Sequence, residues 1–359
     1  MFGPTLDGCS KCLFPHLLRI GPEVEARYLA PMIKKVHIKN FKTLKDLAFP
    51  CTRMNLFIGD TSTGKSNILE ALTLLSRGSV TNGKFDQRLV RYDDIEDLFP
   101  LRDLSDPMVI DIGLIKATMN LEHGRFKLTV QERKSSTSGW SEGVVAPIET
   151  NGLIHGSSFQ FTSLLRRYAY DPEVKFGYNS MKELEPPFGT NFAGLLAANK
   201  QLRSRISKVL EGTGLRLEVN LKENVVRLSK FTDENVVVTL PYGNLSDTIK
   251  RYLFMYAILE TVKGFTLLFD EPEQNTFPFY TKHMAEMMAL DKENQYFITT
   301  HNEYLFRSIV EKTASKDLSV FISHLDADGF TQLKRLTAKE LSELLDGDIF
   351  FNLDRYTPA

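Results

Sequence analysis

The sequence has few cysteines and no long apolar segment. Cys9 and Cys12 form one C-x-x-C pair, and Cys51 is the only other cysteine among 359 residues. A zinc site or a thioredoxin-type redox motif is therefore not indicated, and free thiols in a reducing compartment are the better interpretation. No apolar run approaches the roughly 18 residues of a membrane-spanning helix, and the amino terminus does not have the pattern of a signal peptide. We expect a cytoplasmic protein without a membrane partner.

Neither sign of charge is in excess. Lysine and arginine together number 44 and aspartate and glutamate 45, which gives a net charge of −1. The composition therefore provides no global attraction to nucleic acid, so any DNA-binding surface must be local. With 42% hydrophobic and 25% charged residues, the chain has the composition of an ordinary globular protein.

The most informative segment is the glycine-containing run from Gly59 to Ser66, which fits the G-x-x-x-x-G-K-[ST] phosphate loop. It lies between a predicted strand at 54–58 and a predicted helix at 68–75, for which Gly78 is the expected stop. In such a loop, backbone N–H groups surround phosphate oxygens at the positive end of a helix. The residues predicted to bind nucleotide are Gly59, Asp60, Thr61, Ser62, Thr63, Gly64, Lys65, Ser66 and Asn67.

The side chains of this loop have distinct predicted roles. Lys65 would reach the β- and γ-phosphates of a nucleotide, and the hydroxyl of Ser66 would bind Mg²⁺. An ordinary glycine-rich turn is the alternative interpretation.

Two later apolar segments each end in polar groups. The predicted strand 265–269 is followed by Asp270 and Glu271, at the end of a strand where open α/β sheets bind ligands. Asp270 would hold Mg²⁺, and Glu271 would orient and deprotonate the attacking water. The apolar segment 296–298 precedes His301, which would donate a hydrogen bond to a γ-phosphate. A polar loop is the alternative for the acidic segment, and a surface or satisfied core histidine is the alternative for His301.

Together these segments resemble an ATP-binding-cassette (ABC) ATPase of the non-transporter branch that includes RecF, SMC and the overcoming-lysogenization-defect (OLD) ATPases. The resemblance begins at 32–46 and continues through the phosphate loop, a signature-like segment at 245–247, the acidic segment 270–273 and the segment 299–301. It implies an α/β fold with a mixed core sheet, an N-terminal antiparallel β portion and an inserted helical lobe. It also implies ATP and Mg²⁺ as cofactors.

The resemblance further implies a homodimer, in which Ser246 of one subunit contacts the nucleotide held by the other. Two departures from the family pattern stand out. Thr248 occupies the position where a glycine usually follows the signature serine, and its side chain would obstruct close approach to a γ-phosphate. The glutamine that senses Mg²⁺ in the family has no clear counterpart: Gln87 is a weak candidate, and a solvated loop side chain is favoured there.

The resemblance and the local patterns predict four regions: an N-terminal extension at 1–31, a first part of the ATPase core at 32–133, an insertion at 134–240 and a second part of the core at 241–359. Before and within the insertion we expect strands at 109–115 and 126–130 and a long mobile loop at 134–158. A helix at 192–210 that stops at Gly212 and strands at 215–221 and 236–238 would follow. Basic residues along that helix allow a phosphate-contacting face, but a solvated face is favoured.

Two functional hypotheses remain open. The first is an ATPase that dimerises around ATP and Mg²⁺ to control a process linked to DNA or to an effector, such as DNA repair or defence against mobile DNA. A nuclease activity would come from a partner protein, since only 58 residues follow His301. The second is a binding scaffold gated by ATP, with negligible hydrolysis, that regulates a partner. The long heptad arms of an SMC protein are not indicated.

Overall fold

The computed structural model describes residues 32–135, 137–155, 162–177, 182–211, 213–220, 222–223, 225–232 and 236–357. The predicted N-terminal extension, with Cys9 and Cys12, and the predicted helix stop at Gly212 lie outside these residues. Cys51 is a buried free thiol, and burial raises its pKa to about 12. That thiol is therefore protonated at neutral pH and packs as a small apolar group.

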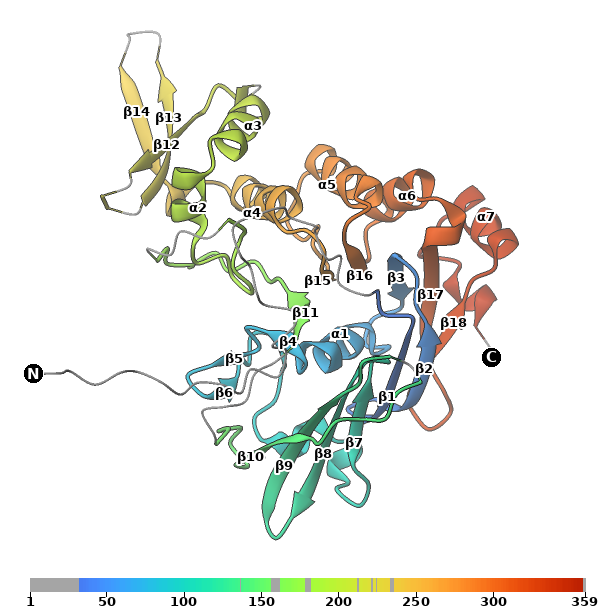
Figure 1. Cartoon of the computed structure of the whole chain (residues 1–359). Coiled ribbons are helices and arrows are strands. Elements are labelled where there is room, and N and C mark those ends of the chain that lie inside the picture. Colours follow the sequence, from blue (N-terminus) through green and yellow to red (C-terminus); the bar gives the residue numbers. More distant parts are fainter. Residues whose placement is uncertain are drawn as a thin grey trace, which may run out of the picture.

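The first part of the described chain contributes to an antiparallel sheet with the order β10-β9-β8-β7-β1-β2 (Figure 1). Its strands are β1 (Lys35–Phe41), β2 (Leu44–Pro50), β7 (Met108–Asp111), β8 (Ile115–Glu122), β9 (Arg125–Glu132) and β10 (Val144–Ile148). Buried residues alternate with more exposed ones along β1 and β8, as expected when one face of a sheet covers a core. This sheet confirms the predicted N-terminal antiparallel portion.

A second, mostly parallel sheet has the order β18-β17-β3-β16-β15-β11-β4. Its strands are β3 (Met54–Gly59), β4 (Ser76–Arg77), β11 (Thr162–Arg167), β15 (Thr266–Asp270), β16 (Gln295–Thr299), β17 (Leu318–Leu325) and β18 (Thr331–Arg335). Only the β17–β18 pair is antiparallel. The carboxyl ends of β3, β15, β16 and β11 therefore meet along one edge, which is where ligands bind in such sheets.

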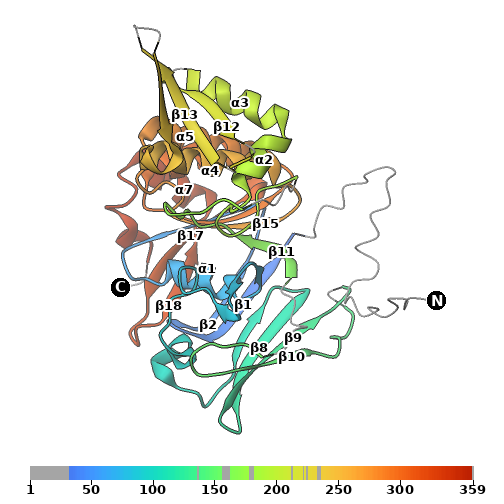
Figure 2. The same ribbon diagram turned by 90° about the vertical axis from the view of Figure 1, so that its left-hand side faces the viewer.

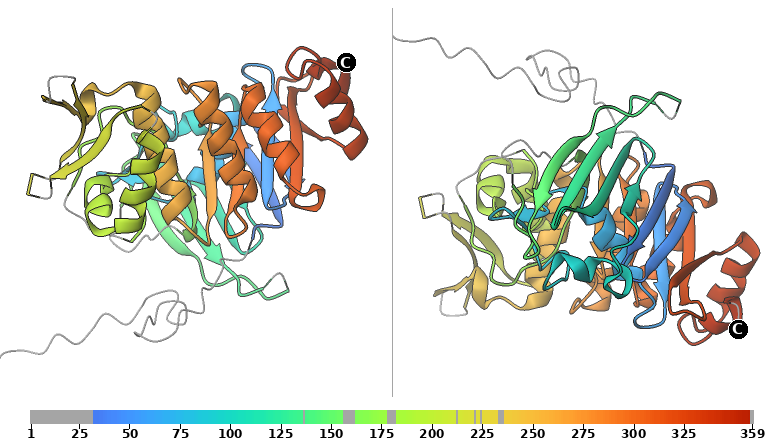
Figure 3. Two further views of the ribbon diagram at one scale, coloured as in Figure 1. Left: turned by 90° about the horizontal axis from the view of Figure 1, so that it is seen from above. Right: turned by 90° about the horizontal axis from the view of Figure 1, so that it is seen from below.

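The two sheets and their helices form layers (Figure 2). Helix α1 (Lys65–Thr73) lies between the parallel sheet and the antiparallel sheet. Helices α4 (Asp247–Thr261), α5 (Pro278–Leu290) and α6 (Glu303–Lys312) run side by side over the other face of the parallel sheet (Figure 3). Helix α7 (Ala338–Asp346) follows β18, and β5 (Val80–Thr81) pairs with β6 (Lys84–Phe85) as a short hairpin.

Two hydrophobic cores lie between these layers, one on each face of the parallel sheet. Leu56 and Ile58 of β3 point into the core under helices α4 to α6. Phe57, between them, points into the core around α1 and the antiparallel sheet, where its ring stacks on those of Phe321 and Phe297 at centroid distances of 5.3 and 6.2 Å. Because adjacent strand residues face opposite ways, a strand that is buried on both sides reads as a continuous apolar run. That run fixes β3 firmly beneath the phosphate loop.

A lobe extends beyond α4, on the side away from the antiparallel sheet (Figures 1 and 2). It contains α2 (Phe192–Ala198), α3 (Lys200–Glu211) and an antiparallel sheet of β12 (Arg216–Asn220), β13 (Val225–Phe231) and β14 (Val237–Pro241). Two of the basic residues on α3 are occupied within the chain: Arg203 donates to the carbonyl of Leu196, and Arg205 pairs with Glu260. These contacts favour a structural role for both over a phosphate-contacting face.

The predicted α/β fold with its mixed core sheet, antiparallel portion and inserted lobe is confirmed. Three local predictions are wrong. Helix α1 ends at Thr73, before Gly78, because the chain turns into β4. The strand expected at 109–115 ends at Asp111, and a tight turn at Gly113 leads into β8. The helix expected at 192–210 breaks at Asn199, whose side chain accepts from the backbone of Leu202 at the start of α3.

The loop expected at 134–158 is also wrong in part, because β10 lies within it and pairs with β9. Pro147 argues against a central strand, but β10 is at the edge of the sheet, where the missing backbone N–H costs no ladder hydrogen bond. Residues 136 and 156–158 of the predicted loop lie outside the described residues.

Candidate nucleotide-binding site

The loop between β3 and α1 has the backbone that a phosphate loop needs. Gly59 and Gly64 have φ angles of 152° and 88°. A Cβ atom on Gly59 would lie 2.3 Å from the hydroxyl oxygen of Ser323, and one on Gly64 would lie 2.0 Å from that of Thr331. Both glycines are therefore required by conformation and by space. The loop leads directly into α1, so the backbone N–H groups at the helix N-terminus face it.

Lys65 lies folded into the loop. Its ammonium donates hydrogen bonds to the carbonyl oxygens of Gly59 (3.0 Å) and Asp60 (2.6 Å), and the residue is only 5% exposed. Burial lowers the pKa of Lys65, against the opposing charges of Glu271, Asp60 and Asp270. A charged group that is held by carbonyls is ready to exchange these contacts for phosphate oxygens, which are stronger partners.

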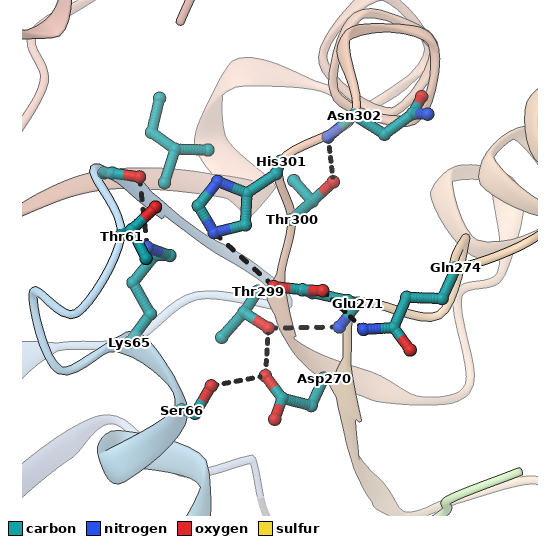
Figure 4. Close-up of polar contacts among 12 residues, drawn as sticks. Thr61, Lys65, Ser66, Asp270, Glu271, Gln274, Thr299, Thr300, His301 and Asn302 are labelled. Atoms are coloured by element: carbon teal, nitrogen blue, oxygen red, sulfur yellow. Dashed lines mark hydrogen bonds and ion pairs between the residues drawn. The ribbon is translucent and has the colours of Figure 1, made fainter.

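Asp270, at the end of β15, faces Ser66 across the site (Figure 4). The Ser66 hydroxyl donates to Oδ1 of Asp270 at 3.1 Å, and the Thr299 hydroxyl donates to the same oxygen. Oδ2 pairs with Nη2 of Arg167 at 3.3 Å. Burial on its own would raise the pKa of Asp270, but Arg167 and the two hydroxyl groups lower it below its usual value.

The Ser66 and Asp270 pair fits a magnesium ion. Mg²⁺ prefers oxygen ligands and is usually bound by one or two protein side chains together with phosphates and water. Two oxygens at adjacent corners of an octahedron with bonds of about 2.1 Å are about 3.0 Å apart. The Ser66 and Asp270 oxygens, 3.1 Å apart, match that spacing.

Glu271 points toward His301 and Gln274 (Figure 4). Its φ angle of 45° turns the backbone, so that its side chain leaves the strand on the ligand side. Its N–H donates to the carbonyl of Thr299 at 3.1 Å, and Nε2 of His301 lies 3.5 Å from its Oε1. Burial and the charge of Lys65 lower the pKa of His301, so the ring is mainly neutral at neutral pH.

Glu273 is a feature that the sequence prediction did not single out. Its Oε1 accepts from the Thr300 hydroxyl at 2.6 Å and from the His301 N–H at 3.3 Å. Its Oε2 is buried and has no hydrogen-bond partner among the described residues. Burial raises the pKa of Glu273 to about 7. Its place as the third acidic residue of the Asp270–Glu273 segment was the available signal, but the sequence does not reveal its burial.

A family comparison agrees with this arrangement. Residues 54–307, which run from β3 to α6, match the model of the family described as "AAA domain, putative AbiEii toxin, Type IV TA system". The chain belongs to this family. This membership supports ATP binding, and it agrees with the RecF/SMC-like ABC-type ATPase that the sequence motifs predict.

Two further comparisons are consistent with the assignment of this chain to an ATPase family. A 74-residue segment is 40% identical to the DNA replication and repair protein RecF of Caldanaerobacter subterraneus subsp. tengcongensis, and it spans 20% of each protein. The fold is similar to the crystal structure of the SmcHead bound to the C-winged helix domain of ScpA, with a TM-score of 0.51 and 14% identity over 87% of this chain and all of that one. The second likeness concerns the fold alone.

The signature-like segment of the ATPase lies at the start of α4. The Ser246 side chain caps this helix by accepting from the N–H of Ile249 at 3.4 Å, and Ser246 is exposed. The Thr248 hydroxyl donates to the carbonyl of Asn275 at 2.8 Å. Within this chain, therefore, the residue that follows the signature-like segment contacts the loop after the acidic segment.

Two other predicted residues of the ATPase have contacts of their own. The side-chain amide of Gln87 donates to the carbonyl of Tyr92 at 2.9 Å, in a hollow that it lines with Arg91 and Asp93. The amide of Asn67 donates to the hydroxyl of Thr43 at 2.9 Å. The contacts of Asp270 are instead with Arg167, Ser66 and Thr299.

A polar pocket of about 310 Å³ adjoins Ser66 and Asp270 in the ATPase. Three arginines line it, namely Arg91, Arg167 and Arg251. The Arg251 guanidinium lies 4.4 Å from the ring centroid of Tyr170, and burial lowers its pKa.

In the part of the chain that the structure describes, no helix is long and apolar enough to cross a membrane.

Proposed function

We propose that this chain binds and hydrolyses ATP with Mg²⁺ between the phosphate loop and the carboxyl ends of β15 and β16. The observation that carries the proposal is the meeting of Lys65, Ser66, Asp270, Glu271 and His301 at one edge of the sheet. A phosphoryl transfer needs positioning and charge stabilisation more than covalent chemistry, and these residues supply both.

In this proposal, the backbone N–H groups of the phosphate loop and Lys65 bind the phosphates. Ser66 and Asp270 hold Mg²⁺, which would neutralise the charge that develops on the phosphate oxygens. Glu271 accepts a proton from the attacking water as the water oxygen bonds to the γ-phosphorus. The bond from that phosphorus to the bridging oxygen breaks, and ADP and inorganic phosphate leave. The neutral ring of His301 donates to a γ-phosphate oxygen.

We further propose that two copies of the chain close around the nucleotide, with Ser246 of one copy acting on the ATP bound by the other. Ser246 supports this because its side chain is exposed at the N-terminus of α4, where a helix attracts anions. The closing and opening of such a dimer would control a process linked to DNA or to an effector protein, such as DNA repair or defence against mobile DNA.

A second candidate, a scaffold gated by ATP with negligible hydrolysis, is favoured by one observation. Thr248 carries a side chain where close approach to the γ-phosphate would call for glycine, and its hydroxyl is engaged with Asn275. In that case ATP would switch the affinity for a partner while turnover stayed near background.

The test is steady-state ATP hydrolysis over a range of protein concentrations, with and without duplex DNA. Lys65→Ala controls for contaminating ATPases, and Glu271→Gln removes the proposed base. A rate per subunit that rises with concentration supports the dimeric ATPase, and stimulation by DNA supports the DNA-linked process. A Glu271→Gln protein should lose turnover by about 100-fold or more and accumulate as an ATP-bound dimer. Background turnover in every condition would favour the scaffold.

A further inference from the structure

Arg167 is placed beside Asp270 by the pairing of their strands. β11 runs parallel to β15, with Arg167 opposite Leu268, so both strands end at the edge that holds the phosphate loop. Because successive strand residues face opposite ways, the two arginines at the end of β11 have different partners. Arg166 pairs with Glu183 at 2.8 Å, whereas Arg167 pairs with Asp270 at 3.3 Å.

The Arg167 guanidinium is buried and incompletely paired. Its side chain is only 7% exposed, and its Nε and Nη1 atoms are buried without a hydrogen-bond partner among the described residues. Burying a charge with unpaired donors is costly unless something compensates. The residue lines the pocket of about 310 Å³ together with Ser66 and Asp270. The Arg167 side chain is therefore part of the wall of the nucleotide site.

The two oxygens of Asp270 are both occupied: Oδ1 by hydroxyl donors and Oδ2 by Arg167. A divalent cation on the same carboxylate would lie a few ångströms from the guanidinium, and at this range two cations that are largely shielded from bulk water repel each other. Arg167 must therefore weaken its contact with Asp270 when the metal binds. Its unpaired Nε and Nη1 groups would then be available to other anions in the pocket.

We propose that Arg167 is the built-in counter-ion of Asp270 in the nucleotide-free protein and that Mg²⁺ displaces it. Arg167 is then a positioning residue that sets how strongly Mg²⁺ promotes ATP binding. This inference rests on the proposed function, because it uses the same metal and nucleotide site. It goes further by assigning a role to a residue outside the phosphate loop and the acidic segment.

The test is the ratio of two dissociation constants of ATPγS, one measured in EDTA and one in excess Mg²⁺, by isothermal titration calorimetry. Arg167→Gln removes the competing charge, so this ratio is expected to rise by about tenfold relative to the unmodified protein, the size expected for one charge-assisted contact. An unchanged or smaller ratio would overturn the proposal.

Arg166→Gln is the matched control. Arg166 is the neighbouring residue in β11, is equally buried and is paired to a carboxylate, but its partner is Glu183. Its substitution should lower the unfolding temperature and leave the ratio within about twofold of that of the unmodified protein. A similar rise in both variants would mean that the effect is general destabilisation, and the proposal would fail.

A second measurement covers the case in which Arg167→Gln does not fold. In a crystal structure of the unmodified protein with Mg²⁺ and ATPγS, Nη2 of Arg167 should be beyond hydrogen-bond distance of Asp270. Persistence of the pair in that complex would overturn the proposal. Failure of the unmodified protein to bind ATPγS in either buffer would refute the proposed function itself. If Mg²⁺ strengthens ATPγS binding but the ratio of dissociation constants is the same with and without the Arg167 side chain, only this inference is refuted.

Discussion

The side-chain amide of Gln274 donates a hydrogen bond of 2.6 Å to Oε2 of Glu271. The other carboxylate oxygen of Glu271, Oε1, lies near the ring of His301. The proposed base is thus restrained at Oε2 by Gln274, which comes from the same loop as Glu271 itself. A base held in one orientation needs less reorganisation when water attacks.

Gln274→Ala should therefore lower kcat for ATP hydrolysis by about five- to tenfold and leave KM nearly unchanged, since the amide positions the base and no phosphate contact is lost. Steady-state kinetics measure both constants. Gln332→Ala is the matched control, because the Gln332 amide binds Asp326 in the β17–β18 turn. An increase in KM with an unchanged kcat would show that Gln274 binds nucleotide instead.

Glu273 should make stability depend on pH. Burial raises its pKa from 4.5 to about 7 in the folded protein, so the folded state binds a proton more tightly than the unfolded state. Stability is then greatest below the unfolded pKa and falls as pH rises toward the folded pKa, with a loss of roughly 3 kcal/mol across that window. Above pH 7 the carboxylate is charged in both states and the loss levels off.

Glu273→Gln keeps an acceptor for Thr300 and His301 but cannot titrate. Thermal unfolding from pH 5 to 8.5 should show a smaller decline in melting temperature for this variant, which is expected to be more stable than the unmodified protein at pH 8. Glu311→Gln, at an exposed position on α6, is the control and should change neither. Parallel curves for Glu273→Gln and the unmodified protein would contradict the assignment.

Much of the candidate site could be predicted because its residues lie in short local motifs. The run from Gly59 to Ser66 and the pairs at Asp270–Glu271 and Thr300–His301 each follow a buried strand, and parallel strands bring such ends together. Arg167 could not be predicted. It lies about 100 residues before Asp270 in the chain, and only the pairing of β11 with β15 brings the two together.

Some elements of the fold can be predicted from the sequence and others cannot, and the reasons are physical. β3 and β15 are apolar along nearly their whole length, since both sheet faces are covered. β10 contains Pro147 and follows a Ser/Gly-rich segment, so its local pattern favours a loop. The break between α2 and α3 leaves the apolar spacing intact, and only the capping side chain of Asn199 marks it.

Gly64→Ala should weaken nucleotide binding. The new Cβ would lie 2.0 Å from the Thr331 hydroxyl oxygen at a φ of 88°, so the loop must move away from its phosphate-binding shape. We expect ATP affinity to fall by at least about tenfold and the melting temperature to drop. Gly124→Ala separates strain from function, since Gly124 has a φ of 77° and open space around it. It should cost about 1 kcal/mol and leave ATP affinity unchanged.

Thr248→Gly distinguishes the ATPase from the scaffold. The substitution removes the side chain beside Ser246 and the hydrogen bond to Asn275, at a small cost in helix stability in the first turn of α4. If that side chain limits approach to the partner's γ-phosphate, turnover per subunit should rise by about threefold or more, most of all at protein concentrations where dimers are scarce. Thr248→Ser keeps the hydroxyl and should behave like the unmodified protein. Equal or lower turnover in a folded Thr248→Gly protein would mean that Thr248 does not limit the reaction. Thr248 would then no longer be an argument for the ATP-gated scaffold.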